Sequence, residues 1–95
     1  MFFLTSKAYE DLKSIAIYTQ ETWGISQRNI YLKMMDDAFN ELSSDPNRGR
    51  KIDNIRTGYY KYKIGKHFIF YRLVSESDIE IIRILHQKMD IESHL

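Results

Sequence analysis

Apolar and polar side chains alternate through the second half of the chain with the two-residue period of a β-strand. Tyr, Phe, Ile and Val dominate the runs at residues 58–64 and 66–74, which meet at Gly65-Lys66. Glycine supplies the backbone freedom that a tight reversal needs. A third run of the same kind covers residues 79–86. This spacing predicts a three-stranded antiparallel meander.

The alternation divides the side chains of the predicted hairpin between two faces of the sheet. One face of the first strand is apolar and aromatic and carries Tyr60, Tyr62 and Ile64. The opposite face carries two cations, Lys61 and Lys63. Basic side chains therefore alternate with aromatic ones along the predicted sheet, and any proposed function must explain why they are there.

The first half of the chain begins with a short predicted strand at residues 2–4, followed by the 3.6-residue period of a helix. Thr5 or Ser6 is placed to cap this helix by accepting a bond from a free first-turn N–H, and Gly24 ends it. The apolar stripe that the helix should bury consists of Ala8, Leu12, Ile15, Ala16 and Trp23.

A second helix follows after two or three residues. Ser26 is placed to cap it, and Asp45-Pro46 closes it, because the residue before proline is pushed out of the α region. Its apolar stripe consists of Ile30, Tyr31, Met34, Met35, Ala38, Phe39 and Leu42. Two helices with so short a link form an antiparallel hairpin that buries its stripes on one sheet face. The fold expected is α+β, one domain over residues 1–95, with an N-terminal strand and an antiparallel helical hairpin packed on a small antiparallel β-sheet.

Charge is segregated along the chain behind a net value of +1. Residues 1–47 hold 4 basic and 7 acidic side chains (−3), residues 48–72 hold 8 and 1 (+7), and residues 73–95 hold 2 and 5 (−3). The basic segment fits two interpretations. It forms either a solvated edge that discourages pairing between sheets or a docking surface for an anionic partner.

Composition limits the compartment and the chemistry. The chain has no cysteine, which fits a reducing cytosol. No apolar run approaches the roughly 20 residues that span a membrane, and no signal peptide is recognisable, so a cytoplasmic protein is expected. Glycine-rich phosphate loops and nucleophile elbows are absent, and the 3 histidines lack metal-ligand spacing. We therefore expect no cofactor and no metal.

One catalytic possibility stays open from the residues alone. A sheet face carrying Lys61, Lys63, Arg72, Arg83 and a histidine has the residue types that cleave RNA. The 2′-hydroxyl would attack the adjacent phosphate, lysine or histidine would act as acid or base, and arginine would stabilise the developing charge. No residue is marked as the base, and basic residues on a sheet are common.

Short runs over nearly the whole chain form a recognisable set. They are Asp11-Leu12, Tyr18-Thr19, Trp23-Gly24, Asp45-Pro46, Gly49-Arg50, Ile55-Arg56-Thr57-Gly58-Tyr59, His67-Phe68-Ile69-Phe70-Tyr71-Arg72 and Arg83-Ile84-Leu85-His86-Gln87-Lys88-Met89-Asp90. This set resembles the ParE toxins of bacterial toxin–antitoxin modules. The wider superfamily includes the RelE-type toxins, and both branches share the fold expected above.

The resemblance implies a toxin that poisons DNA gyrase and is neutralised by a ParD-type antitoxin. The alternative is a RelE-type endonuclease that cuts messenger RNA in the ribosome with basic sheet residues and a terminal Tyr or His. Lys61 and Lys63 match the basic strand of that branch, but Phe68 stands where its sheet arginine is expected, and His94 at the chain end is a poor base. The departure favours the gyrase poison. No membrane and no sequence-specific nucleic acid are expected as partners.

For such a binding toxin the resemblance implies no catalytic set. The residues expected to contact the target lie on the basic hairpin face and at the exit from the last strand, on a side open to the target and away from the helices. They are Lys61, Lys63, Arg83, His86, Lys88 and Met89. Arg83 has a second interpretation as half of a structural ion pair, because a buried arginine needs a partner. Met89 and Ile91 have a second interpretation as cover for the end of the core.

Overall fold

The computed structural model describes residues 1–95 as one five-stranded sheet packed against two long helices. The elements in chain order are β1 (Phe2–Leu4), α1 (Ser6–Trp23), α2 (Ile25–Ser44), a 3₁₀ turn (Pro46–Arg48), β2 (Arg50–Lys51), β3 (Tyr59–Ile64), β4 (His67–Leu73), β5 (Ile79–His86) and α3 (Ile91–His94). The strand order is β1-β5-β4-β3-β2. The predicted α+β class and the β3–β4–β5 meander are confirmed. In addition, β1 joins the edge of β5 in parallel, and a short strand that was not predicted, β2, pairs with β3.

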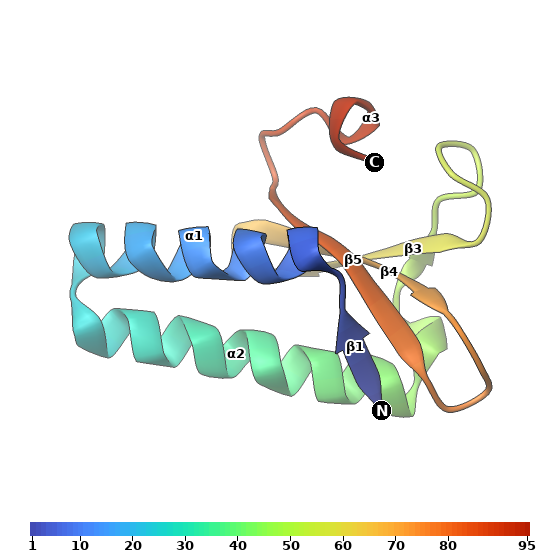
Figure 1. The fold of residues 1–95 in the computed structure, drawn as a ribbon, viewed down its shortest axis with the longest axis horizontal. Coiled ribbons are helices and arrows are strands. Elements are labelled where there is room, and N and C mark those ends of the chain that lie inside the picture. The colour runs from blue at the N-terminus through green and yellow to red at the C-terminus, as the bar shows by residue number, and fades with distance from the viewer.

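The helical layer begins and reverses at capping residues (Figure 1). The Oγ1 atom of Thr5 accepts the N–H of Ala8 at 3.0 Å and caps α1 as predicted. Gly24 ends α1 with a φ of 95°, in the left-handed region that favours glycine. The predicted Ser26 cap is wrong. Only Gly24 separates the helices, so Ser26 already lies in the first turn of α2, whose N-cap makes no side-chain bond.

The main core lies between the helices and one face of the sheet. Its buried residues are Ala8, Ile15, Met35, Ala38, Phe39, Leu42, Tyr60, Ile69, Tyr71, Ile79, Ile81 and Ile84. Tyr62 and Ile64 pack against this cluster, so the apolar face of β3 predicted from the alternation is the face that meets the helices. The rings of Tyr60 and Tyr71 stack with centroids 5.2 Å apart. This stack therefore joins β3 to β4 on the face of the sheet that meets the helices.

Three residues predicted for the helical stripes lie outside the core. Trp23 is 67% exposed, Ile30 is 55% exposed and Met34 is 36% exposed. Trp23 is the last residue of α1, at the end of the helical hairpin. Successive residues of a helix are turned by about 100° from each other, so Met34 faces outward where its neighbour Met35 is fully buried.

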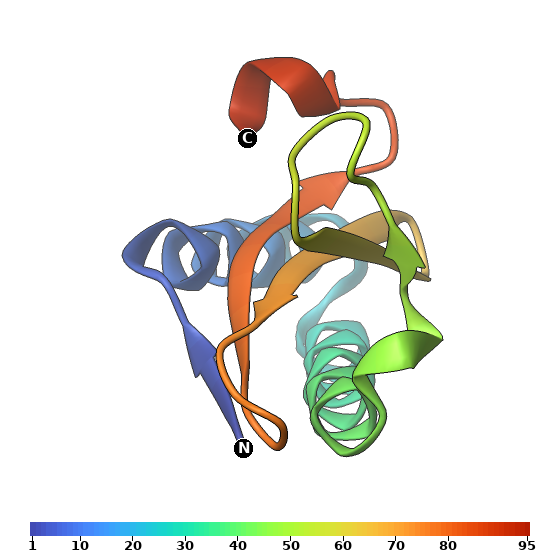
Figure 2. The same cartoon turned by 90° about the vertical axis from the view of Figure 1, so that its right-hand side faces the viewer.

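A smaller second core closes the opposite face of the sheet. Ile52, Phe70 and Leu85 are buried there. The loop after β2 and the short helix α3 cover them at one end of the molecule (Figure 2). Ile91 of α3 packs on this core, as its second interpretation predicted. The same interpretation is wrong for Met89, which lies exposed in the turn before α3.

Candidate functional site

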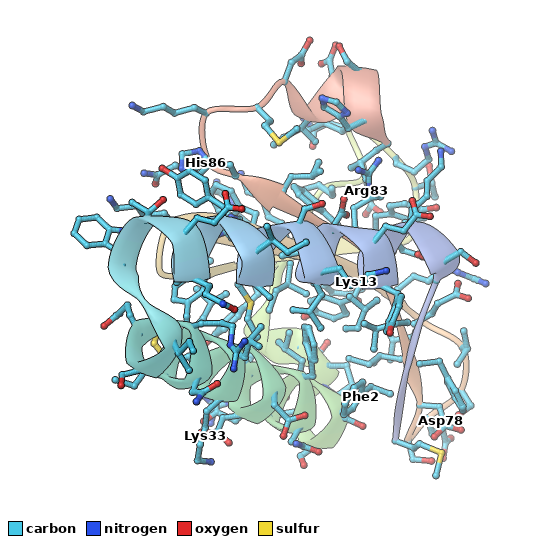
Figure 3. The ribbon with its side chains drawn as sticks, turned by 60° about the vertical axis from the view of Figure 1, so that its left-hand side comes forward. Phe2, Lys13, Lys33, Asp78, Arg83 and His86 are labelled. Carbon is cyan, nitrogen blue, oxygen red and sulfur yellow. The ribbon has the colours of Figure 1, made fainter.

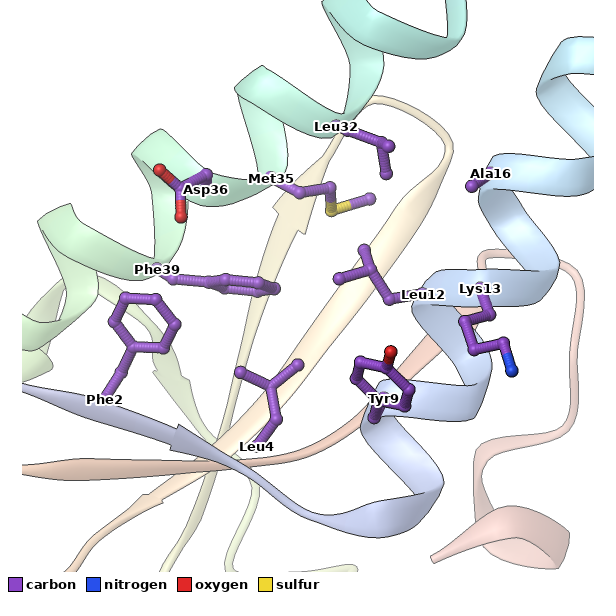
Figure 4. A pocket seen from close by; sticks show the side chains of 10 residues that line it. All are labelled: Phe2, Leu4, Tyr9, Leu12, Lys13, Ala16, Leu32, Met35, Asp36 and Phe39. Carbon is purple, nitrogen blue, oxygen red and sulfur yellow. The ribbon is translucent and has the colours of Figure 1, made fainter.

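An apolar groove runs between α1 and α2 beside β1 (Figure 4). It has a volume of about 430 Å³ and is lined by Phe2, Leu4, Tyr9, Leu12, Lys13, Ala16, Leu32, Met35, Asp36 and Phe39. Phe2 and Phe39 form one end of it, with ring centroids 5.2 Å apart. Lys13 and Asp36 place one charge of each sign on its two helical rims. Such a groove is suited to the apolar face of an amphipathic helix.

The predicted basic hairpin face lies on the other side of the sheet. Lys61 and Lys63 alternate with Tyr60, Tyr62 and Ile64 along β3, so they point away from the helices. The Nζ atom of Lys61 lies 4.9 Å from the centroid of the Phe68 ring. This is a cation–π geometry. Both lysines are therefore displayed on a partly aromatic surface, as the alternation predicted.

The strand exit lies on the opposite face from these lysines. The β4–β5 register places His86 opposite His67, and the two rings meet edge to face with centroids 5.3 Å apart. His67 in turn contacts Tyr31 of α2. The expectation that the exit points away from the helices is therefore wrong for His86. Lys88 and Met89 follow in an exposed turn, where the N–H of Lys88 donates to Nδ1 of His86 at 3.2 Å.

Tyr31 fastens the β3–β4 turn to α2. Its hydroxyl lies 2.6 Å from Nδ1 of His67 and accepts the N–H of Lys66 at 3.1 Å. Burial and, to a smaller extent, the nearby His86 together lower the pKa of His67 to about 4. His67 is thus neutral near pH 7, with its Nδ1 in a hydrogen bond to the Tyr31 hydroxyl. A Cβ atom at Gly65, where φ is 57°, would lie 2.6 Å from the Tyr31 hydroxyl, so the turn requires glycine.

Arg83 is held in a structural ion pair with Asp11, which confirms its second interpretation. Figure 3 shows Arg83 between α1 and the C-terminal helix α3. Its Nε and Nη2 atoms donate to the two carboxylate oxygens of Asp11 at 2.7 and 2.8 Å. Its Nη1 donates to the main-chain oxygen of His94 at 3.2 Å. Both side chains of the pair are only 15% exposed. The hydrogen bond to Asp11 raises the pKa of Arg83, so the guanidinium is always charged.

Asp11 is the residue that sequence reasoning missed. Its carboxylate also accepts the N–H of Ile84 at 3.0 Å, on the part of the β5 edge that β1 does not cover. The Asp11 carboxylate therefore accepts hydrogen bonds both from an uncovered strand edge and from a buried guanidinium. The signal was present in the sequence, because Asp11 lies three residues after Ala8 and four before Ile15, both of them buried. That spacing places an acid on the flank of the buried stripe.

The structure brings the basic hairpin face and the exit from β5 to the same end of the sheet. Lys63 pairs with Phe68, which pairs with Leu85, the residue before His86. The N–H of Gln87 donates to the main-chain oxygen of Lys66 at 2.9 Å. The hairpin turn and the strand exit are therefore neighbours, although their side chains occupy opposite faces.

This end of the sheet offers a surface for binding. The structure has no group of three or more His, Cys, Asp or Glu residues that could hold a metal ion. Among its helices, none combines the length and the apolar character needed to cross a membrane. The guanidinium of Arg72, a candidate in the catalytic interpretation, is bound to Glu80 at 2.9 Å.

Comparisons with known proteins match this architecture over nearly the whole chain. Residues 2–91 match the family described as ParE toxin of type II toxin-antitoxin system, parDE. The chain is 36% identical over 94 residues to Toxin ParE1 of Mycobacterium tuberculosis, covering 99% of this chain and 96% of that one. It is 34% identical over 92 residues to Toxin ParE1 of Caulobacter vibrioides, covering 97% and 94%. A solved structure described as a chromosomal ParDE TA system from P. aeruginosa superposes with a TM-score of 0.74 over 90% of this chain and 92% of that chain. At 18% identity it shows the shared fold.

Proposed function

The chain belongs to the ParE toxin family of type II toxin–antitoxin systems, and from this membership we propose that it poisons DNA gyrase by binding and is neutralised by a ParD-type antitoxin. The observation that carries the proposal is the family match over residues 2–91. Gyrase is the target that the family resemblance implies. The toxin acts without catalysis, by occupying a surface of its target.

The contacts of the candidate catalytic groups support binding over RNA cleavage. The Arg83 guanidinium is already bound to Asp11 and to the His94 main chain, so it has no free edge for a developing phosphate charge. The His67 ring is neutral near pH 7, and its Nδ1 is already hydrogen-bonded to the Tyr31 hydroxyl. A general base must lie within hydrogen-bonding reach of the proton it removes. These engaged groups make the RelE-type alternative the weaker one.

We place the target contacts at the end of the sheet where the hairpin turn meets the strand exit. The contacting residues are Lys61, Lys63, His86, Lys88 and Met89. Arg83 belongs to the same set as a positioning residue, because its ion pair with Asp11 fixes the last residues of β5. The surface presents cations and one apolar side chain, Met89, to the target.

We place the antitoxin on the opposite layer, in the groove between α1 and α2. Eight of its ten lining residues are hydrophobic, which suits an amphipathic helix of the antitoxin. Phe2 and Leu4 line the groove from β1, which is the edge strand of the sheet. A segment leaving the groove therefore reaches an edge to which it can add a strand. The antitoxin's C-terminal half is expected to be disordered when free and rich in acidic and apolar residues.

A pair of assays tests the toxic activity. Purified protein is added to a gyrase supercoiling reaction and, separately, to translating ribosomes with a reporter message. The proposal expects loss of supercoiling with the message intact. A message cut at codons would overturn it in favour of the RelE-type alternative. If neither reaction is affected, the chain only binds its antitoxin and the proposed poisoning is wrong.

The contact surface is tested by the double variant His86→Ala, Lys88→Ala, which removes no buried apolar group. It should stay folded, bind antitoxin as the wild type does and inhibit supercoiling less. The matched control is Arg28→Ala, Lys33→Ala on α2, which also removes two polar side chains from the surface. If the exit variant inhibits at wild-type potency, the strand exit is not the gyrase site, and the basic hairpin face takes its place.

The antitoxin site is tested by Ala16→Arg, which fills the groove, against Ser14→Arg on the exposed side of the same helix. Only the first should weaken antitoxin binding. Raising the salt concentration should slow association strongly and dissociation little, because the acidic antitoxin is first attracted to the basic segment at residues 48–72, and charge sets the encounter rate more than the final affinity. Association that ignores salt would remove the electrostatic part of the proposal.

A further inference from the structure

Cations gather on the outer sheet face without acidic partners. Arg50 of β2 lies directly opposite Lys61 of β3, and Lys63 follows on the same face two residues along the strand. We call these three residues the basic strip. None of them takes part in any ion pair of the structure. Like charges directly opposite each other across two strands destabilise a sheet, so the arrangement does not stabilise the fold.

The strip is held in place by the core beneath it. The hydroxyl of Tyr71 donates to the main-chain oxygen of Pro46 at 2.6 Å and accepts the N–H of Gly49 at 2.9 Å. A Cβ atom at Gly49 would lie 2.1 Å from this hydroxyl, so only glycine fits the close approach. Tyr71 is fully buried. It therefore fixes the start of β2, and with it Arg50, relative to β3.

The composition of the strip identifies the kind of partner. The cores of protein–protein interfaces are depleted of lysine and are anchored by apolar and aromatic side chains. The strip offers three cations, and the Phe68 ring beside Lys61 is already covered by that lysine and packs against the second core. Protein–DNA interfaces are instead strongly basic. Phosphate contacts need no apolar anchor, and a basic stripe on one face is the electrostatic footprint of a nucleic-acid backbone.

We propose that the basic strip binds the phosphate backbone of double-stranded DNA without reading its sequence. Within the proposed function, on which this step rests, the toxin would contact the DNA that gyrase holds as well as gyrase itself. The charge distribution orients the approach. Residues 1–47, which include both long helices, carry −3, whereas residues 48–72 carry +7. The segment that carries the strip is therefore the basic part of the chain, and it attracts a polyanion.

The test measures binding of a fluorescein-labelled 20-base-pair DNA duplex by anisotropy at several salt concentrations, with no gyrase present. The strip variant is Arg50→Glu, Lys63→Glu, in which both residues are exposed. The matched control is Arg28→Glu, Lys33→Glu on α2, which changes the net charge equally. Three phosphate contacts predict a slope of log K against log salt of about −3 for the wild type. The strip variant should bind at least 10-fold more weakly with a shallower slope, and the control should stay within about 3-fold of the wild type.

A stability measurement separates this effect from misfolding. The single variant Arg50→Glu places an acid opposite Lys61, so its Tm should rise by about 1–5 °C while DNA binding weakens. Equal losses in the strip variant and the control would mean that only net charge matters, and would overturn the site. The inference is also overturned if the wild type does not bind DNA at 50 mM salt, or if the strip variant loses only antitoxin binding. A wild type that blocks supercoiling without binding DNA contradicts this inference alone. A wild type that binds DNA without blocking supercoiling contradicts the proposed function.

Discussion

The two faces of the sheet are closed in different ways. The helix-covered face buries 12 residues in one cluster that joins both long helices to the three strands β3, β4 and β5. The outer face buries only Ile52, Phe70 and Leu85. Its cover is the loop after β2 and the four-residue α3, fastened by hydrogen bonds from Arg56 to Leu95 and from Arg83 to His94. The comparison teaches that one face holds the fold together, while the other leaves cations free for partners.

The largest effect is expected from emptying the helix-covered core. Phe39→Ala removes a ring that is 3% exposed, and we expect it to lower the free energy of unfolding by about 3–5 kcal/mol. Leu12→Ala should cost less, because Leu12 lies half-buried in the groove wall. Urea denaturation checks both values. Unchanged unfolding of Phe39→Ala would contradict the assignment of this face as the stabilising one.

The next effect concerns the ion pair that joins α1 to β5. Asp11→Ala leaves the Arg83 charge and the Ile84 N–H without their acceptor, so we expect a loss of about 3 kcal/mol. Replacing both partners, as in Asp11→Leu with Arg83→Met, should cost less than Asp11→Ala alone. A double-mutant cycle from thermal unfolding measures the coupling between the two residues. Additive losses would show that the pair does not act as a unit.

Acidification should weaken the contact that Tyr31 of α2 makes with His67 at the β3–β4 turn. The folded pKa of His67 is about 4 against 6.5 for an ordinary histidine, so the unfolded chain binds more protons between these values. The contribution of neutral His67 to the free energy of unfolding is therefore fully present above pH 6.5 and is lost as the pH falls toward 4. For a half-buried histidine we expect a loss of about 2 kcal/mol.

The measurement for His67 is the free energy of unfolding from pH 7 to pH 4 in wild type and in His67→Asn. The asparagine keeps a hydrogen-bond acceptor near Tyr31 but does not titrate. Between pH 7 and pH 4, the free energy of unfolding of His67→Asn should fall by about 2 kcal/mol less than that of the wild type. If the two curves run parallel, His67 does not carry the acid sensitivity.

The smallest effect is expected at the outer face. Truncation after Asp90 removes α3, and with it the partly buried Ile91 and Leu95. The fold should remain intact, because chain ends carry little buried backbone, and the loss should be about 1 kcal/mol, or roughly 4–8 °C in Tm. Antitoxin binding should be unchanged, since the groove lies on the other layer, while gyrase poisoning should weaken. Complete unfolding of this variant would mean that both faces stabilise the molecule equally.

The site was partly readable from the sequence. The alternation along β3 placed Lys61 and Lys63 on the outer face, and the structure agrees. The pairing of Arg83 with Asp11 was not readable as a pair, because the two residues are 72 positions apart. The orientation of His86 depended on the β4–β5 register, which shifts between Phe70 and Tyr71. A one-residue irregularity of this kind moves later side chains to the other face.

The sequence by itself determined the two long helices, the strands β1, β3, β4 and β5, and their order, because period, capping and turn chemistry act over a few residues. Thr5, Gly24 and Gly65 marked their boundaries through local backbone preferences. Tertiary structure alone decided which flank of each helical stripe met the sheet, and so left Trp23 and Ile30 exposed. It also placed β1 beside β5 and Tyr31 beside His67. These contacts depend on how whole layers pack across long separations, which no local pattern specifies.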